Sequence, residues 1–258
     1  MMAAGHGTFP VVIDLEARKL ARATVARVAT VAALVLVLVT TAGGYAAAMH
    51  AGDTDLGRKA ASMVTSPGWD GYTALGATSV GVTMLLAAGV VMSWSAGREF
   101  VDGTIVGLFA IPSRLGIIAA AKMAVVLTWA TILGAVEAGA LTTAGLLLGL
   151  GPEGAAGCCT TLMLVAALLG ASVLPVMWAA TRWRGYLAGI GLTLVILVVA
   201  NLAAGFGLGS YVPWSVPIVW VSHQTEVSTP LLATPVMTAA IGAWVTLRSW
   251  DRLQLGAD

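Results

Sequence analysis

Residues 98–122, REFVDGTIVGLFAIPSRLGIIAAAK, lie between two long apolar runs and decide how the rest of the chain is interpreted. The stretch contains an acid, a Gly-Thr step, a short apolar run, a Pro-Ser-Arg step and a lysine that opens the next apolar run. A plain loop between membrane helices needs only polar and turn-forming residues, so this ordered pattern requires a further explanation. The residues that make up the pattern are Glu99, Gly103, Thr104, Pro112, Arg114 and Lys122.

The composition around this stretch predicts an all-α polytopic membrane protein. Of the 258 residues 59% are hydrophobic and only 10% are charged, and the mean hydropathy is +0.93. A soluble domain averages about 25% charged residues, so this chain cannot cover its surface with water-loving groups. The net charge of +1 gives no basic face for nucleic acid, and we expect no nucleic-acid partner.

The residue patterns of the common catalytic and metal sites are missing from the sequence. There is no G-x-x-x-x-G-K-[ST] phosphate loop, no H-E-x-x-H and no G-x-S-x-G step. The three histidines are scattered, and the adjacent Cys158 and Cys159 are interpreted as small residues of a membrane helix. We therefore expect no catalytic residue, no metal site and no cofactor bound by this chain.

Six apolar runs are long enough to cross about 30 Å of hydrocarbon as helices. They are expected at residues 28–49, 72–94, 117–149, 158–180, 186–208 and 231–247, in one permease domain covering 1–258. A cleaved signal peptide is an alternative for 28–49, but such a leader would be unusually long, and a retained helix is favoured.

The distribution of basic residues predicts that both termini are cytoplasmic. With six spans, 11 of the 13 Lys and Arg residues fall on the side of the N-terminus, and the positive-inside rule assigns that side to the cytoplasm. Only Arg58 and Lys59 fall outside. The abundance of Ala, Gly and Val is typical of a bacterial genome rich in GC, so a bacterial inner or plasma membrane is expected.

Two short segments do not fit the pattern of spans. Residues 9–27 predict a basic helix in the membrane interface, with Arg18, Lys19 and Arg22 at headgroup level; an unstructured basic flank is the alternative. Residues 210–230 contain two prolines around Trp214 and are too short to cross. They predict a re-entrant or interfacial segment with Trp214 at headgroup depth.

The 98–122 pattern resembles the first cytoplasmic loop of the ABC-transporter permeases of the type-2 exporter class. Members carry E-x-x-x-G-T, then P-x-R, then a lysine at the start of the third membrane helix. The interfacial helix, the six spans and the Pro-Trp-x-x-Pro step before the last span are also similar, so the resemblance covers nearly the whole chain. In that family the loop forms a short coupling helix that docks on a separate ATPase.

The resemblance implies an ATPase-coupling site and a set of partners. Its residues would be Arg98, Glu99, Asp102, Gly103, Thr104, Phe109, Pro112 and Arg114, with Lys122 at the membrane interface. The implied partners are two ATP-binding subunits, which would hold ATP and Mg²⁺, a second permease that is identical or homologous, and the lipid bilayer. An ordinary interfacial loop is the alternative for this stretch.

Two polar residues within the apolar runs are candidates for a substrate path or gate. Glu137 is the one acid inside such a run, and charges at membrane depth are costly and often functional. Asn201 more often joins helices than binds substrate. A secondary transporter working alone is the alternative function, but it needs ion-coupling carboxylates and often a repeat, and only Glu137 is present.

Overall fold

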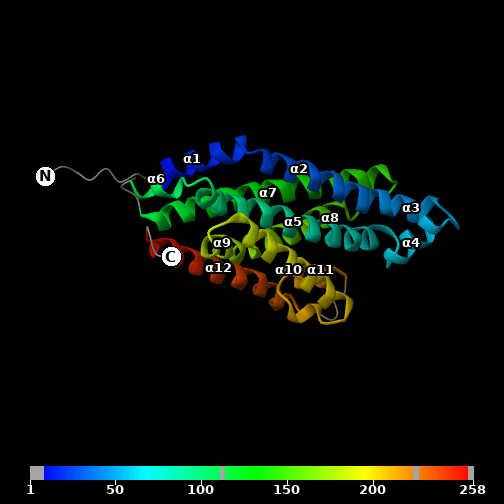
Figure 1. The fold of residues 1–258 in the computed structure, drawn as a ribbon. Coiled ribbons are helices and arrows are strands. Elements are labelled where there is room, and N and C mark those ends of the chain that lie inside the picture. The colour runs from blue at the N-terminus through cyan, green and yellow to red at the C-terminus, as the bar shows by residue number, and fades with distance from the viewer. Residues whose placement is uncertain (1–8, 111–113, 223–226, 255–258) are drawn as a thin grey trace.

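The computed structural model describes residues 9–110, 114–222 and 227–254, and within them every regular element is helical. Six helical segments are long and apolar enough to span a membrane. The structure therefore confirms the expected all-α fold with six spans. The helices run alongside one another in an elongated bundle (Figure 1).

Some of the six spans are built from more than one helical segment of the described chain. The first span joins α2 (Thr24–Val37), a π-helical segment (Leu38–Gly43) and α3 (Gly44–His50). The others are α5 (Gly68–Val101), α7 (Leu115–Leu147), α8 (Ala155–Ser172) with α9 (Pro175–Arg182), α10 (Tyr186–Gly205) and α12 (Ala233–Asp251). The shorter helices are α1 (Phe9–Arg22), α4 (Asp55–Met63), α6 (Ile105–Phe109) and α11 (Val216–Ser222), with 3-10 turns at Gly209–Tyr211 and Thr229–Leu232.

The second span extends beyond the residues expected from hydropathy. Hydropathy ends it at residue 94, whereas α5 continues to Val101, because a charged side chain ends an apolar window without ending a helix. With 34 residues, α5 is about 50 Å long and exceeds the roughly 30 Å hydrocarbon core. Arg98 and Glu99 therefore lie on the last turns of a membrane helix, ahead of the loop.

α5 is the central helix of the bundle. In its most apolar window 67% of the residues are buried, against 22% for the first and last spans. Glycine permits its close approach to α10: a Cβ on Gly97 would lie 2.2 Å from the backbone nitrogen of Tyr186, and one on Gly89 would lie 2.4 Å from the Thr193 side chain. The α9–α10 turn is thus fixed against the end of α5 that carries Glu99.

The connections at the two ends of the first span are more ordered than their polarity suggests. Ala23 is extended, with φ −72° and ψ 124°, and this single residue separates α1 from α2. At the other end, the polar connection 50–71 contains α4, whose first turn is capped where the Thr54 hydroxyl accepts a hydrogen bond from the Gly57 amide at 3.0 Å.

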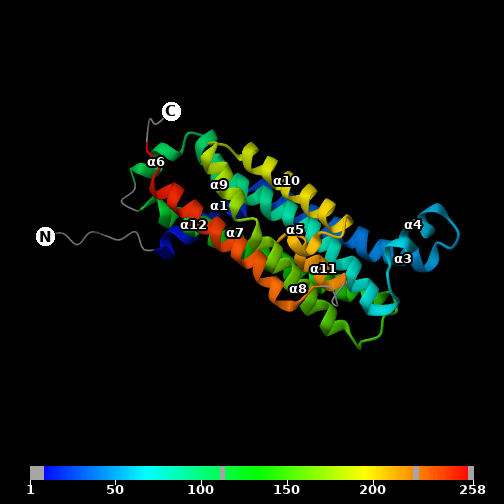
Figure 2. The ribbon, with the colours of Figure 1, turned by 90° about the horizontal axis from the view of Figure 1, so that it is seen from below.

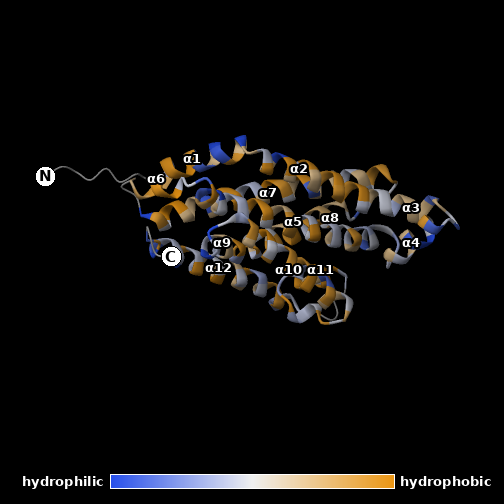
Figure 3. Ribbon diagram, in the orientation of Figure 1, coloured by the Kyte–Doolittle hydropathy of each residue, from blue (hydrophilic) through white to orange (hydrophobic). Residues whose placement is uncertain are grey.

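The polar residues gather at the two ends of the bundle. α1, α6 and the C-terminal end of α12 lie at one end, and α3 and α4 lie at the opposite end, as two perpendicular views agree (Figure 1, Figure 2). Colouring by hydropathy shows apolar ribbon along the middle of the long helices and hydrophilic residues toward the ends (Figure 3). This is the pattern of a body surrounded by lipid along its length.

The segment before the last span is a short helix packed into the bundle. α11 has seven residues and rests on α5, where a Cβ on Gly81 would lie 2.6 Å from the Ile218 Cδ1 atom. The side chain of Trp214 is partly buried against the core, and its Nε1 donates a hydrogen bond to the Ser172 carbonyl at 3.1 Å. The indole of Trp214 therefore packs against the other helices and is hydrogen-bonded to them.

Candidate functional site

Four charged side chains meet at the end of the bundle that carries α1 and α6. The Lys122 ammonium lies 2.8 Å from Glu16 Oε2 and 2.8 Å from Glu99 Oε1. Lys19 lies 2.7 Å from Glu16 Oε1 and 3.5 Å from Glu99 Oε1. We call these four residues, together with Thr104, the charge cluster. It joins α1, α5 and α7, which are far apart in sequence.

Three of the four charged side chains in the charge cluster are buried, and its acids and bases are equal in number. The side chains of Lys122, Glu16 and Glu99 are 1%, 6% and 4% exposed, and Lys19 is 33% exposed. Two carboxylates balance two ammonium groups, which is the condition for keeping charges away from water at tolerable cost. Because each acid contacts both lysines, no member can move away without leaving a buried charge uncompensated.

Lys19 is the member of the cluster that faces outward. Burial alone lowers the pKa of its ammonium group, but the hydrogen bond and the charge of Glu16, together with Glu99, outweigh that effect and raise the pKa above its ordinary value of 10.5. Lys19 is therefore charged at any physiological pH.

Thr104 ties the start of the loop after α5 to this cluster. Its hydroxyl donates a hydrogen bond of 2.5 Å to Glu99 Oε2, so both Glu99 oxygens are occupied. The chain reverses between the two residues at Gly103, whose φ of +68° lies in the left-handed region that favours glycine. A Cβ there would meet nothing within 4 Å, so Gly103 serves the turn rather than a close contact.

α6 begins directly after Thr104, and one of its sides packs against the core. Leu108 is buried in the core beneath it, and Ile105 packs against the same core. Val106 is 58% exposed on the outer side. A five-residue helix with one apolar side anchored and another apolar residue facing outward is suited to contact a partner surface.

The other residues of the expected coupling site surround the loop without joining the cluster. Arg98 stacks its guanidinium over the Trp94 ring, 4.7 Å from the centroid, and lies 3.7 Å from Asp102. Phe109 is half-buried at the end of α6, and Arg114 is the exposed residue preceding α7. Pro112 lies outside the described residues.

The residues expected at the membrane interface divide into two groups. Arg18 and Arg22 are exposed on α1, where Arg18 forms a 2.9 Å ion pair with Asp14. Lys19 is half-buried, and Lys122 is buried among acids within the bundle. The structure thus makes Lys122 a buried member of the charge cluster, a role that sequence reasoning did not assign to it.

The two candidates for a substrate path lie apart from the cluster and from each other. Glu137 is fully buried on α7, and neither carboxyl oxygen has a hydrogen-bond partner within the described chain. Asn201 lies at the edge of a cavity of about 250 Å³ between α5, α10 and α11, and its amide donates to the Leu197 carbonyl at 2.8 Å.

Sequence reasoning missed two acids of this end of the bundle. Glu16 was overlooked because an acid beside basic residues on an interfacial helix is normally solvated; the signal was its i, i+4 spacing to Leu20 and its i, i+3 spacing to Lys19. Asp251 also went unnoticed. Its carboxylate accepts a hydrogen bond from the Gly116 amide at 3.1 Å and so ties the end of α12 to the first turn of α7.

The fold is that of a multi-pass membrane protein. At one end, the charge cluster shared by α1, α5 and α7 is hydrogen-bonded to the loop that enters α6, a short surface helix. A family model described as ABC-2 family transporter protein matches residues 12–200. The match covers α1 through most of α10, well over half of the chain, and the protein belongs to this family. It is an ABC transporter permease, and membership implies association with an ABC ATP-binding subunit, because the permease is not the catalytic part. No curated protein matches the chain in a direct sequence comparison.

Proposed function

We propose that this chain is the permease of an ATP-driven exporter and that α6, with the turn at Gly103, docks on a separate ATPase subunit. The observation that carries the proposal is the hydrogen bond from Thr104 to Glu99. Through it, the loop that enters α6 is attached to a cluster shared by α1, α5 and α7. A displacement of α6 would therefore move the ends of three helices together.

The mechanism follows from a differential affinity in the partner. ATP and Mg²⁺ bind in the ATPase subunits, and nucleotide favours the closed ATPase dimer over the open one. A ligand shifts a conformational equilibrium only by its difference in affinity for the two states. The closed dimer would carry α6 with it, and the charge cluster would pass that movement to α5, the central helix of the bundle.

The assembly contains two permeases, identical or homologous, and two ATPases. The first and last spans support a second permease, because only 22% of their most apolar windows is buried in a single chain. The charge distribution supports cytoplasmic termini: α1, the end of α5 and the end of α12 carry basic residues and lie at the α6 end, whereas α4, with Arg58 and Lys59, lies at the opposite end. An amphipathic substrate fits the largely apolar body of the bundle.

The test is copurification with a matched pair of surface variants. The tagged chain is extracted in mild detergent, and coeluting proteins are identified by mass spectrometry. We expect a stoichiometric protein with a phosphate loop, lost for Val106→Glu and retained for Leu56→Glu. Both positions are exposed apolar residues on short helices, at 58% and 66%, but they lie at opposite ends of the bundle.

Gly103→Trp extends the test to transport. A side chain at φ +68° strains the turn, so this variant is expected to insert in the membrane and uncouple ATP hydrolysis from transport. Full transport by Gly103→Trp at normal expression, or equal ATPase recovery with Val106→Glu and wild type, would contradict the docking of α6.

The second candidate function is a secondary transporter that works alone, and Glu137 is the observation that favours it. A buried carboxyl group with no hydrogen-bond partner among the described residues is suited to exchange a proton or to bind a cation during transport. Transport driven by an ion gradient in liposomes without any ATPase, and abolished by Glu137→Gln, would support this candidate over the ABC exporter.

A further inference from the structure

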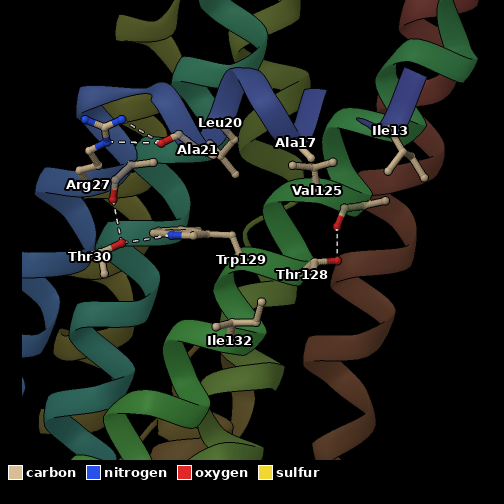
Figure 4. A pocket seen from close by; sticks show the side chains of 12 residues that line it. Ile13, Ala17, Leu20, Ala21, Arg27, Thr30, Val125, Thr128, Trp129 and Ile132 are labelled. Atoms are coloured by element: carbon tan, nitrogen blue, oxygen red, sulfur yellow. Dashed lines mark hydrogen bonds between the residues drawn. The ribbon is translucent and has the colours of Figure 1, made fainter. Parts of the chain in front are cut away.

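An apolar groove of about 430 Å³ lies between α1, α2 and α7 (Figure 4). This volume is in the usual range for small-molecule sites, about 300–1,000 Å³. Leu20 of α1, and Val125 and Trp129 of α7, form its apolar walls, and Arg27 of α2 is its one charged residue.

The groove has a polar end and an apolar end. Figure 4 shows the Arg27 guanidinium beside Ala21 at the α1 end and Ile132 at the opposite end, with Trp129 between them. Arg27 Nε and Nη2 donate to the Ala21 carbonyl at 3.3 and 3.2 Å, which holds the guanidinium at the break between α1 and α2. No hydrogen bond within the described residues uses Nη1.

The polar atoms within the groove are already paired. Trp129 Nε1 donates to the Thr30 hydroxyl at 3.1 Å, and that hydroxyl donates to the Ala26 carbonyl at 2.8 Å. Thr128 donates to the Ala124 carbonyl at 2.8 Å. A ligand would therefore meet hydrocarbon along the walls and a cation at one end.

This combination matches a phospholipid whose acyl chain fills the groove and whose phosphate meets the guanidinium. We propose that the groove binds one anionic phospholipid from the membrane leaflet that contains α1. Arginine suits phosphate because its planar fork donates two parallel hydrogen bonds. The charge at this point is uncompensated: Arg18 is paired with Asp14, whereas no ion pair joins Arg22 or Arg27 to an acid in the described residues.

The bound lipid would also act on the charge cluster. Leu20 and Val125 line the groove on one side and flank Glu16, Lys19 and Lys122 on the other. A lipid packed against Leu20 would hold α1 against α7 and keep Glu16 and Lys19 in place. Stimulation of ATPase activity by anionic lipid follows from this contact, and only this consequence rests on the proposed function.

The binding test uses the fluorescence of Trp129 in the full chain. Purified, delipidated protein in detergent micelles is titrated with brominated phosphatidylglycerol or brominated phosphatidylcholine, and the quenching of Trp129→Phe is subtracted from that of the wild type. The difference is the quenching of Trp129 itself, which we call the Trp129 component. We expect it to saturate at a several-fold lower fraction of phosphatidylglycerol than of phosphatidylcholine.

Two matched pairs of variants locate the site. Arg27→Gln should weaken the apparent affinity for phosphatidylglycerol about fivefold, the contribution of one interfacial arginine, whereas Arg22→Gln should leave it unchanged. Thr128→Phe should fill the groove and abolish the Trp129 component, whereas Thr131→Phe should preserve it. Both threonines are exposed on α7 and bond to a carbonyl four residues earlier, but only Thr128 lines the groove.

Three outcomes would overturn the lipid site. Equal quenching by phosphatidylglycerol and phosphatidylcholine would mean that acyl chains contact Trp129 without selection for an anionic headgroup. An equal loss with Arg22→Gln and Arg27→Gln would mean attraction to the surface charge of α1. A Trp129 component that is present in the monomer but lost in a dimer would assign the groove to a second copy of the chain. Lipid binding without any effect on a partner ATPase would count against the proposed function and leave the site intact.

Discussion

Replacing Lys122 by methionine is expected to destabilise the folded chain by about 3–5 kcal/mol, because removing one partner of a buried ion pair leaves an uncompensated buried charge. In the folded chain Lys122 is 1% exposed and lies 2.8 Å from two carboxylates. Methionine has a similar length and fills the space, so the loss is electrostatic. Lys19, at one third exposure, remains the only cation within ion-pair distance of Glu16 and Glu99 among the described residues.

The assay is unfolding in a graded series of SDS concentrations, with helical content and tryptophan fluorescence as readouts. Lys59→Met is the matched control, because Lys59 is exposed on α4 at the other end of the bundle and should change stability little. The double variant Lys122→Met with Glu99→Gln removes one charge of each sign. It should be more stable than the sum of the two single effects, by about 1–3 kcal/mol for residues in direct contact.

Either of two results would refute this reasoning. Stability of Lys122→Met within the error of Lys59→Met would show that the cluster is solvated in the membrane-bound protein. Strict additivity of the Lys122 and Glu99 substitutions would show that the two side chains are not coupled in the folded state.

Four further perturbations have definite expected results in the same unfolding assay. Thr104→Val should lower the free energy of unfolding by about 1.5–3 kcal/mol, because it removes a hydrogen bond to a charged group. It should also weaken the coupling of ATP hydrolysis to transport, and wild-type coupling would contradict this. Glu137→Leu should raise stability by about 1–3 kcal/mol, because it removes a buried polar group without a partner, and a loss of stability would reveal a partner for its carboxyl group. Gly97→Ala should lower the free energy of unfolding by at least about 1–3 kcal/mol, because the added methyl group would overlap the first residue of α10. Gly139→Ala is the control: its methyl group would lie in open space, and the variant should gain about 0.5–1 kcal/mol of helix stability. The stabilisation due to the raised pKa of Lys19 should be fully present below pH 10.5 and lost as pH rises through the higher folded-state pKa, and Lys19→Met should remove that alkaline loss.

The expected locations of the spans follow from physics that is local in sequence. Twenty or so apolar residues in a row have one stable arrangement in a bilayer, so hydropathy identified all six spans. Their ends were less certain. α5 runs past Arg98 and Glu99, because a helix continues through charged residues that find partners. The partners of Glu99, Lys19 and Lys122, are on other helices.

The order of residues in 98–122 identified the family without the structure, since E-x-x-x-G-T, P-x-R and the following lysine are read along one chain. It also singled out Glu99, Thr104 and Lys122 as members of one pattern. What it could not supply was their mutual geometry, because the bond from Thr104 to Glu99 depends on the turn at Gly103.

The sequence by itself therefore determined the class of protein and the number of spans, because hydropathy and motif order are properties of neighbouring residues. Only the tertiary structure decided that Lys122 is a buried counterion, that Glu16 completes its pair of acids, and that Arg27 closes one end of an apolar groove. Each of these depends on α1 folding back against α7, a contact between residues about a hundred positions apart that no local pattern encodes.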